Sequence, residues 1–177
     1  NSLQIIASIL LLKARSVQSK ETRGHLEHAH RRVMSVASLQ QHLKATGMGE
    51  EVELGSYLTK LCEALSGSMV REQRPIILSV EAGPGSVHSE QAVSIGLIVT
   101  ELVINALKYA FHGDMAEGRV VVGYEVKGKS WVLSVSDNGG GMQEKPDQKS
   151  TGLGTALVKA LAQQLEARVD VKTSHKG

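Results

Sequence analysis

The chain has 177 residues, of which 41% are apolar and 3% aromatic, so it can form one or two domains with an aliphatic core. Twenty basic and eighteen acidic residues leave a net charge of +2 without a basic cluster, which argues against a nucleic-acid partner. A single cysteine, Cys62, fits a reducing cytoplasm, and the longest apolar stretch, residues 5–12, is too short to cross a membrane.

The N-terminal part predicts a helical hairpin. Residues 1–17 carry Leu3, Ile6 and Leu10 at heptad spacing, and a polar break over residues 16–21 ends this first helix. A second helix to about Ala45 has an apolar stripe of Leu26, Ala29, Val33, Val36 and Leu43. A lone hairpin cannot bury both stripes, so residues 1–48 are expected to form a dimeric four-helix bundle, joined at the glycines of residues 46–49 to a second domain.

Residues 49–177 alternate between helical and strand patterns. The expected helices are 55–66, 89–111 and one beginning at about 152, and the expected strands are 75–81, 119–126, 130–136 and 168–173. The turn at residues 127–129 joins the middle two strands as a hairpin. The pattern predicts an α+β fold, a two-layer α/β sandwich in which helices cover one face of a mixed sheet.

The helix expected over residues 89–111 is apolar on almost every side, so its polar residues stand out. Glu101, Asn105 and Lys108 project from one stripe of this helix. A carboxylate, an amide oxygen and an ammonium in a row suit a triphosphate with Mg²⁺, which takes oxygen ligands. The alternative is a polar face whose members pair with one another.

Asp137 follows the strand pattern of residues 131–135 and precedes three glycines. An ionised carboxylate at a strand end can accept a hydrogen bond from the exocyclic amine of adenine, whereas guanine presents a carbonyl there. The glycines let a ligand approach the backbone. Asp-Asn-Gly is also a common hairpin turn, and that alternative stays open.

A second glycine motif, Gly152-Leu153-Gly154-Thr155, opens the last helical pattern. A glycine-rich loop leading into a helix presents backbone N–H groups to an anion, and phosphate is the natural occupant. Ordinary helix entry with Thr155 in the first turn explains the same residues. The polar segment 142–151 between the glycine motifs is expected to be a loop that closes over the nucleotide.

In their order and context, these three motifs resemble the catalytic domain of sensor histidine kinases, which belongs to the GHKL superfamily of ATPases. The resemblance implies catalytic roles for Glu101 and Asn105 and a Mg²⁺ ion held by Asn105. It places adenine at Asp137, and phosphates and ribose beside Lys108 and Tyr109. The ATP contacts that it implies are Asn105, Lys108, Tyr109, Asp137, Gly139, Gly141, Met142, Gly152, Leu153, Gly154 and Thr155.

The first fifteen residues are similar to the segment that follows the phosphoacceptor in kinases whose acceptor motif is His-Arg-x-x-Asn, with Asn1 as the last residue of the motif. This resemblance implies an acceptor histidine before Asn1. It also implies a cytoplasmic, homodimeric histidine kinase of a two-component system. Such a kinase transfers the γ-phosphoryl group of ATP to histidine and then to an aspartate on a response-regulator receiver domain, without membrane contact from this chain.

Two other functions fit parts of the sequence. A serine kinase or hydrolytic ATPase of the same superfamily would use the same motifs, and a catalytically silent adaptor would keep the hairpin to dock a regulator. His25, His28, His30 and His42 raise the further possibility of a zinc site or an acceptor on the second helix, but no cysteine or acidic residue is spaced to complete a tetrahedron.

Overall fold

The structure is a computed structural model that describes residues 51–69, 76–111, 117–140 and 153–172, together with scattered residues between 12 and 34. The chain divides into two compact units, Asn1–Glu50 and Glu51–Gly177. The boundary expected at residues 48 and 49 stays a prediction, and each unit is described by itself.

In the first unit, the described residues from 22 onward are helical, whereas Gln18 and Ser19 are not. The Ser19 hydroxyl oxygen accepts a hydrogen bond from the backbone N–H of Thr22 at 3.3 Å, as an N-cap side chain does. This start of a helix lies directly after the expected polar break. The four-helix bundle, the end of the second helix and the glycine linker were also predicted, and they lie outside the described residues.

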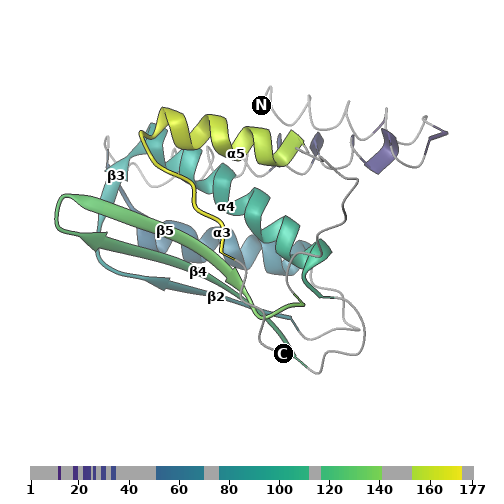
Figure 1. The fold of residues 1–177 in the computed structure, drawn as a ribbon, viewed down its shortest axis with the longest axis horizontal. Helices are drawn as coiled ribbons and strands as arrows, with labels where there is room; N and C mark the ends of the chain where they lie inside the picture. Colours follow the sequence, from purple (N-terminus) through teal and green to yellow (C-terminus); the bar gives the residue numbers. More distant parts are fainter. Residues whose placement is uncertain are drawn as a thin grey trace. The chain divides into compact units, whose positions relative to one another are not determined.

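The second unit is the predicted two-layer sandwich (Figure 1). Its elements are β1 (Glu51–Glu53), α3 (Leu54–Met69), β2 (Ile76–Ala82), β3 (Ser86–His88), α4 (Ser89–Tyr109), β4 (Gly118–Lys127), β5 (Ser130–Asp137) and α5 (Leu153–Gln164). Strand β4 lies between β2, to which it is parallel, and β5, to which it is antiparallel. The sheet is therefore mixed, as expected.

The alternation of buried and less buried residues along β4 shows which face of the sheet packs against the helices. Val120, Val122 and Tyr124 are at most 4% exposed, and their partners on β5 include Val135 and Leu133. Side chains of neighbouring residues point to opposite faces, so this row faces the helix layer. On the other face Val132 of β5 is 45% exposed. The helices cover one face and leave the other open.

Helix α4 is the central core helix. Ile95, Val99 and Val103 are almost completely buried, and the helix packs against α3, α5 and the sheet. By length and composition it is apolar enough to span a membrane, which the sequence analysis did not anticipate, but 61% of its most apolar window is buried inside the protein. This burial is what a core helix shows.

Helix α3 packs through a row of leucines, Leu54, Leu58, Leu61 and Leu65. The Glu53 carboxylate begins the helix, because its two oxygens accept hydrogen bonds from the N–H groups of Gly55 at 3.0 Å and Ser56 at 2.6 Å. Burial raises the pKa of the Cys62 thiol to about 11, so this cysteine packs in the core and is not a reactive thiolate.

Tyr57 on α3 is buried, and its hydroxyl has no hydrogen-bond partner in the described part of the structure. Burial also raises its pKa. Because an unsatisfied buried polar group costs stability, Tyr57→Phe should raise the free energy of unfolding by about 1 kcal/mol. Urea unfolding of both proteins measures this, with Tyr109→Phe, whose ring is 62% exposed, as the control that should change nothing. A destabilised Tyr57→Phe protein would mean that the hydroxyl is bonded.

One predicted strand is not formed, and one small sheet was not predicted. The expected strand over residues 168–173 is wrong: Arg168–Lys172 pair with no described strand, and Arg168 instead binds the neighbouring Asp170 carboxylate at 2.8 Å. Alternation of apolar and polar residues predicts an extended chain, but it does not supply a neighbouring strand with which that chain can form hydrogen bonds. The small antiparallel sheet of β1 and β3 was not predicted, because each strand is only three residues long.

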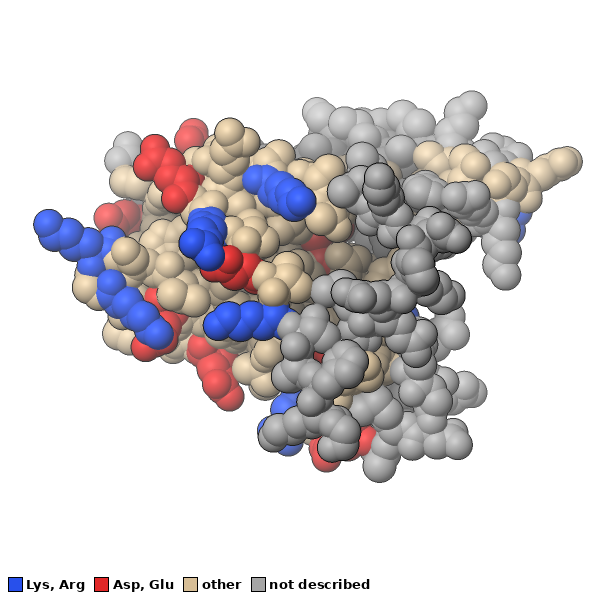
Figure 2. Space-filling view, viewed as in Figure 1, with Lys and Arg blue, Asp and Glu red and all other residues tan. Residues whose placement is uncertain are grey.

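Figure 2 shows that basic and acidic side chains are interspersed over the described part of the visible face. Opposite charges so close together partly cancel. Beside the β4–β5 turn, the charged atoms of Lys127 and Glu125 are 3.0 Å apart. The described residues on this face therefore produce no large field of one sign.

Candidate functional site

The polar stripe of α4 runs from the core to the surface. Glu101 is 1% exposed, Asn105 and Lys108 are half-buried, and Tyr109 is 62% exposed. Neither Glu101 nor Lys108 lacks an interaction partner. The exposed end of the stripe is the C-terminal end of the helix, so a ligand can reach Asn105, Lys108 and Tyr109 more easily than Glu101.

Asp137 is the last residue of β5 and pairs with Val120 of β4. Since Val120 faces the helix layer, Asp137 lies on that same face of the sheet, at the edge where the strand ends. Its side chain is exposed, and one carboxylate oxygen accepts a hydrogen bond from the N–H of Gly139 at 3.0 Å. The second oxygen has no hydrogen-bond partner among the described residues, so it can accept a hydrogen bond from a ligand.

The turn after Asp137 contacts the end of α4. The N–H of Gly140 donates to the carbonyl oxygen of Ala110 at 2.9 Å. Gly139 lies so close to Ala110 that an added Cβ atom would stand 2.6 Å from its carbonyl carbon. Ala110 directly follows Lys108 and Tyr109. The structure therefore brings the first two predicted motifs together at one edge of the sandwich.

Helix α5 begins at Leu153, so Gly154 and Thr155 lie in its first turn, with Thr155 exposed. The helix packs against α4, which carries the polar stripe. The first-turn N–H groups of a helix favour an anion. Gly141, Met142 and Gly152, which were also predicted as nucleotide contacts, lie outside the described residues, as does the loop between the two glycine motifs.

Metal-binding residues do not cluster in the part of the chain that the structure describes: no group of three His, Cys, Asp or Glu side chains could hold an ion there. A Mg²⁺ ion does not need such a group, because it is commonly bound by one or two protein oxygens together with substrate phosphates. Asn105 is the predicted oxygen ligand. Of the four histidines in the predicted second helix, only His30 is described.

Family models match both parts of the chain. Residues 1–69 match a model described as histidine kinase, and residues 90–177 match the histidine kinase-, DNA gyrase B- and HSP90-like ATPase model. The chain belongs to the histidine kinase family. The second match covers the polar stripe, Asp137 and both glycine motifs, so the part of this histidine kinase that carries the candidate site is an ATPase-type domain.

Relatives of this histidine kinase chain include the sensor histidine kinase PdtaS of Mycobacterium tuberculosis, which is 30% identical over 91% of the chain and 32% of its own length. Blue-light-activated histidine kinase 2 of Erythrobacter litoralis is 30% identical over 97% of the chain and 50% of its length. The chain thus spans between about a third and a half of these curated relatives.

Solved structures agree with the fold. The blue-light activated histidine kinase EL346 of Erythrobacter litoralis superposes with a TM-score of 0.73 at 28% identity, over 98% of this chain and 54% of that one. Its histidine kinase domain alone gives a TM-score of 0.70 at 29% identity, over 98% and 81% of the two chains. The α+β architecture of the histidine kinase chain is therefore shared with its relatives.

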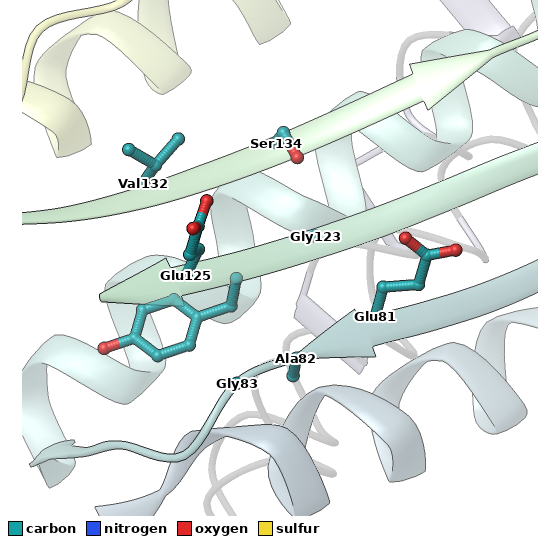
Figure 3. Close-up of a pocket in the computed structure, with 8 residues that line it drawn as sticks. Glu81, Ala82, Gly83, Gly123, Glu125, Val132 and Ser134 are labelled. Atoms are coloured by element: carbon teal, nitrogen blue, oxygen red, sulfur yellow. The ribbon is translucent and has the colours of Figure 1, made fainter. Parts of the chain in front are cut away.

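The open face of the sheet of this histidine kinase carries a separate hollow of about 510 Å³ (Figure 3). Its floor is Gly123, whose missing side chain leaves space beside Ser134, and Glu81, Glu125 and Val132 stand around it. None of the predicted site residues lines this hollow. The candidate site and the hollow lie on opposite faces of the sheet.

Sequence analysis missed two contributors to the candidate site, Asn138 and Ala110. Asn138 was considered only as the middle residue of the Asp-Asn-Gly turn, and Ala110 was not singled out. An Asn directly after a strand is a recognisable signal for side-chain bonding to the backbone. The sequence carries no comparable signal for the contact at Ala110, because that contact depends on the position of the Asp137 turn in the folded chain.

Proposed function

We propose that this chain binds ATP with Mg²⁺ and transfers the γ-phosphoryl group to a histidine, as the core of a homodimeric, cytoplasmic two-component kinase. The proposal rests on one contact. The N–H of Gly140, in the turn after Asp137, donates to the carbonyl oxygen of Ala110 at the end of α4, the helix that carries the polar stripe. The match to an ATPase-type family model supports the same nucleotide. A response-regulator receiver domain is the proposed acceptor of the phosphoryl group from histidine.

Adenine recognition is assigned to Asp137. Its carboxylate lies exposed at the strand end, so its oxygens can accept a hydrogen bond from the exocyclic amine of adenine but not from the carbonyl of guanine. The turn that carries it is held to α4, which keeps the carboxylate at a fixed distance from the phosphate-binding end of the helix.

Phosphate binding is assigned to the half-buried stripe and the start of α5. Lys108 supplies positive charge, Tyr109 borders the ribose and phosphates, and the first-turn N–H groups around Gly154 and Thr155 face an anion. Glu101 is 1% exposed, so we assign it to positioning this part of α4 rather than to contact with the acceptor imidazole.

In the transfer itself, a neutral imidazole nitrogen attacks the γ-phosphorus with its lone pair, and the bond to the β–γ bridging oxygen breaks. ADP leaves with that electron pair. Such a transition state is loose, so the protein contributes mainly alignment and charge neutralisation. When bound, Mg²⁺ would be held by the amide oxygen of Asn105 and would neutralise phosphate charge.

The test of nucleotide identity is calorimetric titration with ATP and GTP in Mg²⁺. We expect the unmodified chain to prefer ATP, and Asp137→Asn to lose about tenfold or more in ATP affinity, since a hydrogen bond to a charged group is worth about 1.5–3 kcal/mol. Asp170→Asn makes the same charge change at an exposed carboxylate bound by Arg168 and should leave the affinity unchanged. Equal affinity of the unmodified chain for both nucleotides would contradict the assignment.

A further inference from the structure

The side chain of Asn138 continues the β4–β5 ladder by one position beyond the last backbone pair. The N–H of Asn138 donates to the carbonyl oxygen of Arg119 at 3.1 Å, as in an ordinary antiparallel pair. The return bond is different, because the N–H of Arg119 donates at 2.6 Å to the side-chain oxygen Oδ1 of Asn138. The amide side chain thus takes the place of the main-chain carbonyl.

The same side-chain amide makes a second hydrogen bond, to the backbone just before β4. Its Nδ2 donates to the carbonyl oxygen of Glu117 at 3.2 Å. One side chain therefore satisfies a donor and an acceptor on the backbone of residues 117–119. Asn is suited to this because its amide carries both kinds of group, as a peptide unit does.

The substitution of side chain for main chain frees the backbone of residue 138 to turn. Since its own carbonyl is not needed for the bond to Arg119, the chain can leave the sheet directly after Asp137 and turn to α4. There the N–H of Gly140 reaches Ala110 at 2.9 Å, and the N–H of Gly139 reaches the carboxylate of Asp137 at 3.0 Å. The turn is thus fixed both to β4 and to α4.

We propose that Asn138 is a positioning residue for the nucleotide: its amide holds the turn in which the Asp137 carboxylate is presented. The inference rests on the proposed binding of adenine at Asp137. Asn138 itself need not touch the ligand, since both ends of its amide are occupied by backbone. Loss of the amide leaves only the backbone bond from residue 138 to Arg119 on the β4 side, so Asp137 samples more positions and binds adenine less tightly.

The experiment compares Asn138→Ala, which removes both side-chain bonds, with Asn138→Asp, which keeps an acceptor for Arg119 and loses the donor to Glu117. ATP and GTP affinities are measured by calorimetry on the whole chain, at a temperature where circular dichroism shows each protein folded. We expect Asn138→Ala to bind ATP about tenfold more weakly, which corresponds to about 1.4 kcal/mol. The preference of Asn138→Ala for ATP over GTP should also be smaller. The ATP affinity of Asn138→Asp should lie between those of the unmodified chain and Asn138→Ala.

Glu53→Ala is the matched structural control. It removes two side-chain bonds to backbone at the start of α3, near Ala82 and therefore at the other end of the sheet from Asp137. It should lower the thermal midpoint without changing the ATP affinity. If Asn138→Ala behaves like Glu53→Ala, with a lower midpoint and unchanged affinity, Asn138 is merely structural and the inference is overturned.

Two further outcomes separate the inference from the proposed function. An unmodified chain that binds no ATP overturns both. An unmodified chain that prefers ATP, together with Asn138 variants that bind it equally well, overturns the positioning role alone. Should Asn138→Ala fail to fold, the Asn138→Asp protein decides: a loss of at least about threefold in ATP affinity supports the role, and unchanged affinity overturns it.

Discussion

Gly139→Ala is expected to lower both the stability of the chain and its affinity for ATP. An added Cβ atom would overlap the carbonyl group of Ala110 and stand 2.6 Å from the Ala110 Cβ. The neighbouring atoms are largely backbone, so relief requires the Asp137 turn and the end of α4 to move apart. Such overpacking costs about 1–3 kcal/mol of unfolding free energy. The bond between Gly140 and Ala110 would weaken with it.

The adjacent Gly140→Ala provides the control, because a Cβ atom there meets nothing within 4 Å. Among the described glycines only Gly128 has a positive φ, of 63°, so neither position in the Asp137 turn requires a left-handed backbone. The two variants thus differ mainly in steric contact. Thermal unfolding and ATP titration should show Gly140→Ala close to the unmodified chain, and Gly139→Ala less stable with an affinity lower by about tenfold or more. Similar behaviour of both variants would show that the close contact with Ala110 does not hold the Asp137 turn in place.

Strong local patterns made most of the second unit predictable. Helix α4 was recognisable because Ile95, Val99 and Val103 belong to a long apolar run, and its bounds differ from the prediction only at the C-terminal end. The β4–β5 hairpin followed from alternation on both sides of Lys127-Gly128-Lys129. In each case, the signal and the structure lie within the same stretch of about ten to twenty residues.

Contacts between distant residues were less accessible. The β1–β3 pair joins Glu51 to His88, and neither three-residue strand has a pattern of its own. The extended segment after α5 has the alternation of a strand without a described partner. Pairing depends on tertiary packing, which outweighs such weak local preferences.

The candidate site likewise has one part that was predictable from sequence and one part that was not. Glu101, Asn105 and Asp137 each left an alternative open, and the order of the three motifs together with their resemblance to histidine kinases predicted the nucleotide and its metal. Their arrangement was not predictable, since it depends on Asn138 reaching Glu117, 21 residues away along the chain, and on Gly140 reaching Ala110. The chemistry of the site is thus a prediction from the sequence, and the structure adds how the described parts of the site are held together.

Asn105→Ala is expected to have the largest effect on phosphoryl transfer. The half-buried amide is the proposed oxygen ligand of Mg²⁺, on the stripe between the buried Glu101 and the half-buried Lys108. Loss of a metal ion that neutralises phosphate charge removes several kcal/mol of transition-state stabilisation. We therefore expect transfer from γ-labelled ATP to histidine to fall by about a hundredfold or more, which corresponds to about 2.7 kcal/mol.

Nucleotide binding separates the metal role from general damage to α4. In EDTA, Asn105→Ala and the unmodified chain should bind ATP equally well, because adenine recognition at Asp137 is intact in both. Adding Mg²⁺ should tighten binding to the unmodified chain and leave the variant almost unchanged. Asn105→Asp keeps an oxygen ligand, so it should retain the response to Mg²⁺.

Transfer is measured on protein that includes the acceptor histidine. If Asn105→Ala responds to Mg²⁺ as the unmodified chain does, Asn105 does not hold the metal, and a carboxylate such as Glu101 becomes the ligand to test.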